Sequence, residues 1–156
     1  MSTVMRGALR LRLVVPEVRL GGATPGALVG VNLGALLLEA GVLEAAPSVR
    51  DGAVVYPLAL PDGVSVAIPL VTASGGGLAG MLGPLEVALR NDRGRLRLAV
   101  PALPFVVPMV QSALARWIVG GPVDDGGQAV FWLRLTTGTE AALSLGVMGR
   151  LGIEVP

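Results

Sequence analysis

The sequence predicts an α+β protein in which a curved antiparallel sheet or partial barrel of seven to eight strands packs against two helices. Three observations carry this prediction. Several short segments alternate between apolar and polar residues, which is typical of strands with one solvated face. Turn signals separate most of these segments, which favours antiparallel neighbours. Two longer apolar segments carry the start and stop signals of helices. The chain of 156 residues is interpreted as a single domain, 1–156, because that length suits one hydrophobic core.

The clearest strand signals lie near the N-terminus and in the middle of the chain. The stretch "ALRLRLVV" places apolar residues on one face and Arg10 and Arg12 on the other. The stretches "LEVALR" and "RLRLAV" alternate in the same way. Between them lies "NDRG", residues Asn91–Gly94, which predicts that the two strands form a hairpin.

Two further hairpins are predicted from the same kind of signal. "VVYPLAL" and "VSVAIPL" flank the turn sequence Pro61–Gly63, and "AVFWLRL" and "AALSLGVMG" flank "TTGTE". Pro57 and Pro69 fall inside strand-like runs, and because proline cannot donate to a ladder, these strands are expected at edges or bulges. The stretch "LGIEV" is the last predicted strand.

The first predicted helix begins at Thr24, an N-cap residue, with Pro25 at the first helical position. It runs to Gly41, a residue that commonly ends helices. Its residues are apolar nearly all round, so we expect it to be buried. The alternative is an all-β sandwich in which Leu20–Gly41 forms a loop and a strand.

The second predicted helix is "PMVQSALARWIVGG". Pro108 fits its first turn, and Gly120–Gly121 should end it. Its apolar stripe is made of Val110, Leu114 and Trp117–Ile118.

The composition excludes several kinds of chemistry. The chain contains no histidine, no cysteine and no lysine. Imidazole bases, thiol nucleophiles, disulfides and zinc sites built on Cys or His are therefore absent. A serine nucleophile would lack the histidine or lysine that usually activates it. The net charge of +1 and the aromatic content of 3% predict no nucleic-acid partner.

Hydrophobic residues make up 53% of the chain, which raises the question of a membrane. Three uncharged runs have nearly the length of a spanning helix: Leu20–Leu38, Gly63–Leu85 and Leu98–Ala115. Glycine or proline interrupts each run, so no spanning helix is predicted. The first fifteen residues do not read as a secretory signal because arginines interrupt their apolar stretch. The expected location is the cytoplasm, and contact with a membrane surface stays open.

The stretch "TASGGGLAGMLGP" places Gly75, Gly77 and Gly80 on the G-x-G-x-x-G spacing of dinucleotide-binding loops. That fingerprint needs a crossover helix and a parallel second strand. Pro84 closes the segment before a crossover helix could fit, and a strand follows it at once. We therefore expect a flexible loop and no nucleotide cofactor.

The acidic residues form no recognisable catalytic or metal site. Asp124–Asp125 precedes two glycines and could offer carboxylates to a hard cation, but the same sequence is typical of a solvated turn. No catalytic residue, metal ligand or cofactor is predicted. An enzyme of unknown type stays open as a third hypothesis behind two non-enzymatic ones.

The leading hypothesis is a non-enzymatic binding module with an apolar surface for a lipid-like ligand or a membrane, because charges make up only 15% of the chain. The candidate ligand residues are Phe105, Met109 and Trp117, and the alternative is that Met109, Leu114 and Trp117 pack the core against the sheet. Arg95 and Arg97 are candidates for a lipid head group or an anion, although a solvated strand face with local ion pairs explains them as well. The alternative hypothesis is a structural or assembly protein that buries its apolar surface in a homo-oligomer.

Overall fold

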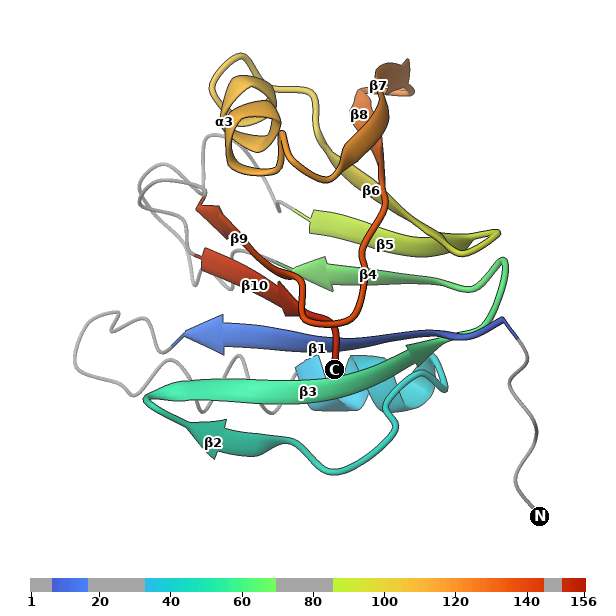
Figure 1. Ribbon diagram of the computed structural model, residues 1–156, viewed down its shortest axis with the longest axis vertical. Coiled ribbons are helices and arrows are strands. Elements are labelled where there is room, and N and C mark those ends of the chain that lie inside the picture. Colours follow the sequence, from blue (N-terminus) through green and yellow to red (C-terminus); the bar gives the residue numbers. More distant parts are fainter. Residues whose placement is uncertain (1–6, 17–32, 70–85, 145–149) are drawn as a thin grey trace.

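The structure, a computed structural model, describes residues 7–16, 33–69, 86–144 and 150–156. This part of the chain is mostly β and folds into two antiparallel five-stranded sheets (Figure 1). The first sheet has the order β2-β3-β1-β10-β9. Its strands are β1 (Leu9–Pro16), β2 (Ser48–Arg50), β3 (Ala53–Leu60), β9 (Glu140–Ser144) and β10 (Arg150–Glu154).

The second sheet has the order β4-β5-β6-β8-β7. Its strands are β4 (Ser65–Pro69), β5 (Glu86–Asp92), β6 (Arg95–Pro101), β7 (Ile118–Asp125) and β8 (Gln128–Leu133). The helix α3 spans Val106–Ala113, and residues 33–39 are also helical. The second sheet therefore comes from one continuous stretch of chain, whereas the first sheet is built from the segments on both sides of it.

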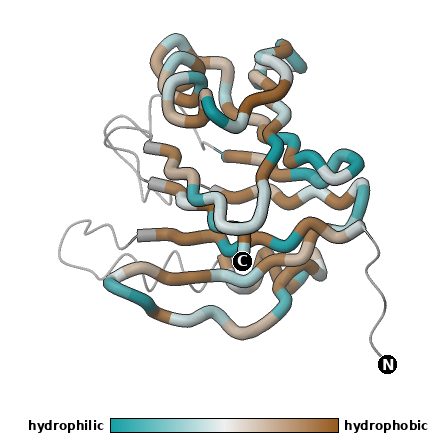
Figure 2. Tube along the Cα trace, viewed as in Figure 1, coloured by the Kyte–Doolittle hydropathy of each residue, from teal (hydrophilic) through white to brown (hydrophobic). Residues whose placement is uncertain are grey.

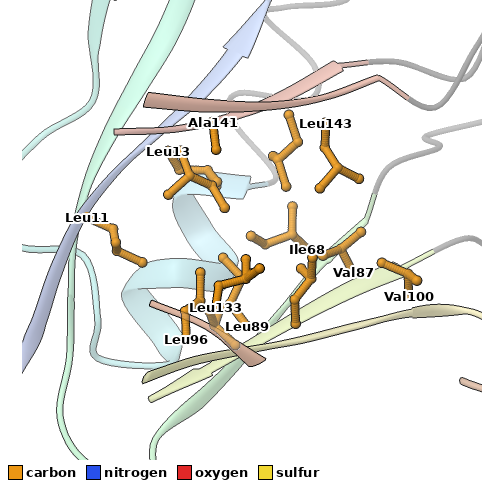
Figure 3. Close-up of a cluster of buried hydrophobic side chains, with 14 of the residues drawn as sticks. Leu11, Leu13, Ile68, Val87, Leu89, Leu96, Val100, Leu133, Ala141 and Leu143 are labelled. Carbon is orange, nitrogen blue, oxygen red and sulfur yellow. The ribbon is translucent and has the colours of Figure 1, made fainter. Parts of the chain in front are cut away.

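One core joins the two sheets. Alternation along each strand turns the leucines of β1, β5 and β6 to the same interior, and the side chains of both sheets form one buried cluster (Figure 3). The largest fully buried side chains include Leu11, Leu13, Tyr56, Leu58, Leu60, Leu89, Leu96, Leu98 and Phe131. The predicted architecture is thus corrected. Two sheets enclose the core, instead of one curved sheet or barrel that packs on helices. The two-sheet arrangement of the alternative prediction, the all-β sandwich, is therefore nearer to the structure.

The N-terminal strand, the C-terminal strand and the central hairpin are confirmed. β1 and β10 lie where the alternating stretches predicted them, and β5 pairs antiparallel with β6. Arg93 and Gly94 form the two-residue loop of that hairpin, with φ of 53° and 87°. Positive φ at both positions matches the right-handed twist of the flanking strands.

The two other predicted hairpins are wrong, because in each case the turn carries the chain from one sheet to the other. β3 pairs with β1 and β2, whereas β4 pairs with β5. β8 pairs with β6 and β7, whereas β9 pairs with β10. The hairpin that does form after α3 joins β7 to β8 through Gly126 and Gly127. Asp124–Asp125 ends β7 beside this turn, as the interpretation of a solvated turn predicts.

Proline positions agree with the prediction only in part. Pro69 ends β4, which lies at the edge of the second sheet as expected. Pro57 lies in β3, which is not an edge strand. Its missing N–H is tolerated because β2 pairs only with residues Ala53–Val55 and has ended before Pro57. At that point the Pro57 carbonyl accepts a 2.9 Å hydrogen bond from the Glu44 N–H.

The helical segment 33–39 ends where the sequence predicts. Gly41 has φ of 73°, and the Val42 N–H donates to the Leu37 carbonyl at 3.1 Å. This is the pattern of a Schellman cap, in which glycine adopts the left-handed conformation. The expectation of all-round burial is wrong. Leu33 and Leu37 are buried, but Leu38 is 70% exposed. The start signal at Thr24–Pro25 lies outside the described residues.

The second predicted helix is shorter than expected. Pro108 lies in the first turn of α3, and Val110 and Leu114 are buried as predicted. The helix ends at Ala113, and β7 begins at Ile118, within the segment that was predicted to be helical. Of the described helices, none has the length and apolar character that a membrane-spanning helix needs.

Candidate functional site

The three predicted ligand residues lie on or beside α3. Phe105 precedes the first helical residue and is 42% exposed. Met109, within α3, and Trp117, after it, are partly buried and pack against the core. Phe105 is thus exposed to solvent, whereas Met109 and Trp117 pack against the core and are partly exposed to solvent.

The segment that contains α3 carries no charged side chain until the exposed Arg116. The run Leu98–Ala115 contains no Asp, Glu, Lys or Arg. Its exposed residues are Ala102, Pro104, Phe105, Pro108, Gln111, Ser112, Ala113 and Ala115. A tight turn, in which the Ile118 N–H donates to the Leu114 carbonyl at 3.1 Å, joins this segment to β7.

β7 adds two exposed valines, between the exposed Arg116 and the exposed Asp124. Val119 is 53% exposed and Val123 is 47% exposed. Both belong to an edge strand of the second sheet, and α3 and β7 lie at the same end of the molecule in Figures 1 and 2. We call the exposed residues of Leu98–Ala115, together with Val119 and Val123, the α3–β7 surface.

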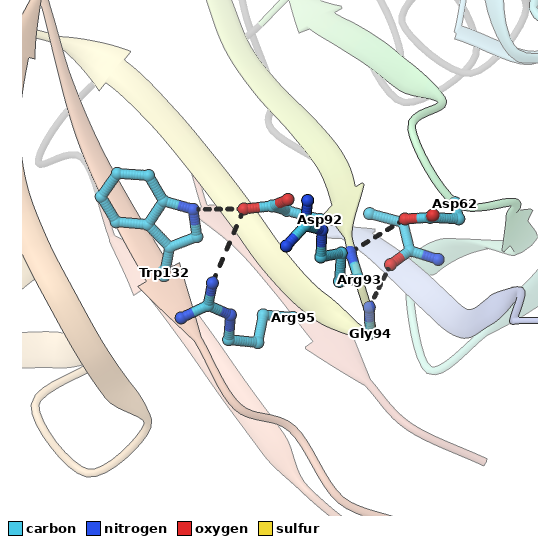
Figure 4. A network of polar contacts seen from close by, with 7 residues as sticks. Asp62, Asp92, Arg93, Gly94, Arg95 and Trp132 are labelled. Carbon is cyan, nitrogen blue, oxygen red and sulfur yellow. Dashed lines mark hydrogen bonds and ion pairs between the residues drawn. The ribbon is translucent and has the colours of Figure 1, made fainter.

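The predicted anion residues, Arg95 and Arg97, are both paired with acids. Asp92 Oδ2 lies 3.8 Å from Arg95 and accepts a 2.9 Å hydrogen bond from the indole N–H of Trp132 (Figure 4). Arg97 donates to Asp125 Oδ2 at 3.0 Å. These local ion pairs, on the outer face of the second sheet, neutralise much of the charge that an anion would meet.

The structure places these arginines away from α3 but nearer to Trp117. Arg97 lies in the first half of β6, and α3 follows the end of that strand at Pro101. Arg97 and Pro101 are four positions apart along the strand, a distance of about 13 Å. Leu133 of β8 pairs with Leu96 on one side and with Ile118 on the other. Arg95, next to Leu96, therefore lies about two strand spacings, or about 10 Å, from Trp117, next to Ile118.

A third place was missed by the sequence analysis. A cavity of about 460 Å³ lies on the outer face of the first sheet, where Arg12, Ser48 and Arg50 supply its polar groups. Of these three polar residues, Arg12 lies in a strand that the sequence predicted. Ser48 and Arg50 lie in β2, which has three residues and is too short to show an alternating pattern.

Two side chains have shifted pKa values. The hydrogen bond and the charge of Glu154 raise the pKa of Arg50, which keeps this guanidinium protonated at any accessible pH. Burial raises the pKa of Tyr56, because the low-dielectric core disfavours a phenolate. Neither shift prepares an acid or base for catalysis near neutral pH.

The described residues contain no group of three or more acids that could hold a metal ion. The glycines of the dinucleotide-like spacing lie outside the described residues. The strands before and after them, β4 and β5, are antiparallel neighbours with Pro69 opposite Glu86. A dinucleotide-binding unit needs parallel strands, so these two strands do not supply its framework.

Comparisons of the chain with models of protein families, with curated proteins and with solved structures found no match. Function is therefore inferred from the chemistry of this chain alone.

Proposed function

We propose that the protein is a non-enzymatic binding module that takes a lipid-like ligand on the α3–β7 surface. The observation that carries the proposal is the uncharged, mostly apolar exposed surface of Leu98–Ala115. Exposed apolar patches on soluble proteins mark partner, ligand or membrane sites. A cytoplasmic protein that meets a membrane at its surface fits this function.

The proposed ligand lies on the surface and not between the sheets. Large side chains from both inner faces fill the described core, and Leu58, Leu98 and Phe131 are each fully buried. Displacing such side chains to admit a lipid chain would cost about 1.5–3 kcal/mol for each side chain. An exposed site requires no such displacement.

Phe105, Met109 and Trp117 are proposed as the contact residues of this site. Phe105 already offers an exposed ring. Methionine adapts to irregular apolar shapes, and tryptophan joins a large apolar body to a polar N–H. Because Met109 and Trp117 are only partly buried, a small rotation of α3 or of a side chain suffices to bring them to a ligand.

Intrinsic fluorescence tests the proposal. The chain has two tryptophans, so the Trp132→Phe variant leaves Trp117 as the one emitting indole. We expect its emission to shift to shorter wavelength on addition of monoolein, an uncharged amphiphile, or of phosphatidylcholine vesicles. Phe105→Ser should weaken this binding at least about tenfold, which corresponds to about 1.4 kcal/mol.

Val49→Ser is the matched control, because Val49 is 75% exposed on β2, away from α3. It should bind like the parent. A parent protein that binds neither monoolein nor the vesicles would contradict the proposal, as would equal binding by Phe105→Ser. In a further variant, Trp117→Ala, loss of binding without loss of folding supports a ligand role. A loss of about 3–5 kcal/mol in unfolding free energy would assign Trp117 to the core instead.

Self-association is a second candidate function, favoured by the opposite side of the molecule. β2 is the edge strand of the first sheet, and its Val49 is largely exposed. Open strand edges with apolar residues are templates for pairing with a second copy. Sedimentation should then show a dimer or larger species at micromolar concentration, and Val49→Lys should return it to the monomer. A monomer at these concentrations in the parent protein would exclude this candidate.

A further inference from the structure

The cavity on the outer face of the first sheet is built by three neighbouring strands. β3 pairs with β1 on one side and with β2 on the other. Arg12 lies opposite Pro57, and Ser48 lies opposite Val55. Directly opposed residues of an antiparallel pair point to the same face, and residues two apart along a strand do so too. Arg12, Ser48 and Arg50 therefore converge over the same part of the sheet.

The walls of the cavity are apolar. Val55 is buried, with 6% of its surface exposed, yet it lies outside the core cluster because it faces outward. Pro57 continues this floor, and Ala45 and Ala46 close one side. The ion pair between Arg10 and Glu44, at 3.0 Å, ties the segment that carries these alanines to β1.

Arg12 and Arg50 differ in their acidic neighbours. Arg50 forms an ion pair with Glu154, which lies directly opposite Arg12 on β10, and the negative charges of Asp51 and Glu140 also raise the pKa of Arg50. Arg12 itself has no ion pair with any acid of the described residues, and the Ser48 hydroxyl has no hydrogen bond there. Arg12 is thus a guanidinium beside an apolar floor whose donors have no acidic partner among the described residues.

We propose that this cavity binds a small oxyanion, a carboxylate or a phosphate monoester, that carries an apolar group. A guanidinium presents its N–H donors as a planar fork that matches the oxygens of a carboxylate or phosphate. The N–H groups of Arg12 donate hydrogen bonds to the oxyanion, and the Ser48 hydroxyl donates a further one. Arg50 donates to the oxyanion with the N–H groups that do not bind Glu154. The apolar group lies on Val55 and Pro57. The volume of about 460 Å³ is in the range of small-molecule sites, which is roughly 300–1,000 Å³.

Isothermal titration with two aromatic oxyanions tests the proposal. Phenyl phosphate and benzoate share an apolar ring and differ in the anion, so the tighter binder tells which oxyanion the site prefers. Benzyl alcohol, which lacks the charge, should not bind. Arg12→Gln should weaken the preferred oxyanion at least about tenfold, and Arg12→Lys, which keeps the charge without the fork, should fall between this variant and the parent.

Two variants separate a binding site from a general effect of charge. Arg134→Gln removes one positive charge from an exposed position on the other sheet, next to β8, and should bind like the parent. Glu154→Gln removes the carboxylate that competes for Arg50 and should strengthen oxyanion binding several-fold. Failure of both oxyanions to bind at millimolar concentration would overturn the proposal, and so would unchanged affinity in Arg12→Gln.

This site is independent of the one proposed on the α3–β7 surface. Phe105→Ser should leave the binding of phenyl phosphate or benzoate unchanged, and Arg12→Gln should leave the binding of uncharged monoolein unchanged. Either proposal can therefore fail without the other.

Discussion

The side-chain amide of Asn91, on β5 of the second sheet, donates a 2.8 Å hydrogen bond to the carbonyl oxygen of Leu60, at the end of β3 in the first sheet. The same amide donates to the Gly7 carbonyl at 2.7 Å, and its oxygen accepts from the Gly94 N–H at 2.8 Å. Asn91 is the buried polar residue of the described core, with no exposed surface. Two of these three hydrogen bonds reach the segments of the first sheet, and the third lies within the β5–β6 turn.

Asn91→Ala should lower the free energy of unfolding by about 2–4 kcal/mol, because it leaves buried backbone groups without partners. Urea unfolding measures this loss. Asn91→Asp should cost more at neutral pH, since it places a carboxylate beside two carbonyl oxygens. Thr137→Ala, at an exposed turn position, is the control and should change stability little. A loss below about 1 kcal/mol in Asn91→Ala would mean that water replaces the lost bonds.

Gly121 should tolerate no side chain. Its φ is 92°, and a Cβ atom there would lie 2.3 Å from the backbone oxygen of Val130. Gly121→Ala therefore forces the paired strands β7 and β8 apart, and we expect a loss of stability well above the roughly 1–3 kcal/mol that an unfavourable φ alone costs. Thermal unfolding tests this expectation.

Gly127 is the matched comparison, because it lies in the turn of the same hairpin. Its φ is 86°, but a Cβ atom there would meet nothing within 4 Å. Gly127→Ala should cost only the conformational term, about 1–3 kcal/mol. Equal losses in the two variants would show that steric contact at Gly121 does not matter.

Stability should fall at alkaline pH because of Tyr56. Burial raises the pKa of Tyr56 in the folded protein above its usual value of 10.0. The folded state then holds the phenol proton more tightly than the unfolded chain, so raising the pH above about 10 favours unfolding. Below that pH the residue contributes no pH dependence.

The chain suits this measurement, because it contains one tyrosine, no lysine and no cysteine. Tyrosinate absorbance therefore follows Tyr56 alone, and it should appear only as the protein unfolds. Tyr56→Phe should remove the dependence of unfolding free energy on pH between about 10 and 11. A tyrosinate signal that rises near pH 10 in folded protein would contradict the assigned burial.

The glycine-rich segment should not confer nucleotide binding. Since β4 and β5 are antiparallel neighbours, the parallel strands that hold a dinucleotide are missing from its flanks. Titration with NAD, FAD or ATP should leave the melting temperature unchanged. A micromolar dissociation constant that is lost in Gly77→Val would contradict this prediction.

Local patterns were sufficient where a structure depends on neighbouring residues. The alternation around Arg10 and Arg12 predicted β1, and "NDRG" predicted the β5–β6 hairpin. The predicted local ion pair forms at Arg95, whose partner Asp92 is three residues away. Arg97 instead pairs with Asp125 of β7, and β8 lies between β6 and β7. The correct predictions are those in which the partner lies close in sequence.

Patterns failed where the partner lies far away. The turn Pro61–Gly63 resembles a hairpin turn, but β3 pairs with β1, at Leu9–Pro16, instead of with β4. "WIVGG" fits the end of an amphipathic helix, so β7 was missed until its pairing with β8 was known. The cavity beside Arg12 could not be predicted for the same reason, since it requires β1, β2 and β3 to lie side by side.

The central place of β1 in the first sheet has a consequence for the order in which the molecule assembles. β1 can pair early with β3, but its other edge stays open until residues 150–154 supply β10. Meanwhile residues 65–133 can complete the second sheet from pairings within one stretch of chain. Contacts between distant positions form slowly, and an open strand edge recruits other chains. We expect folding to finish with the insertion of β10 beside β1, and the half-built first sheet to be the species that aggregates during refolding.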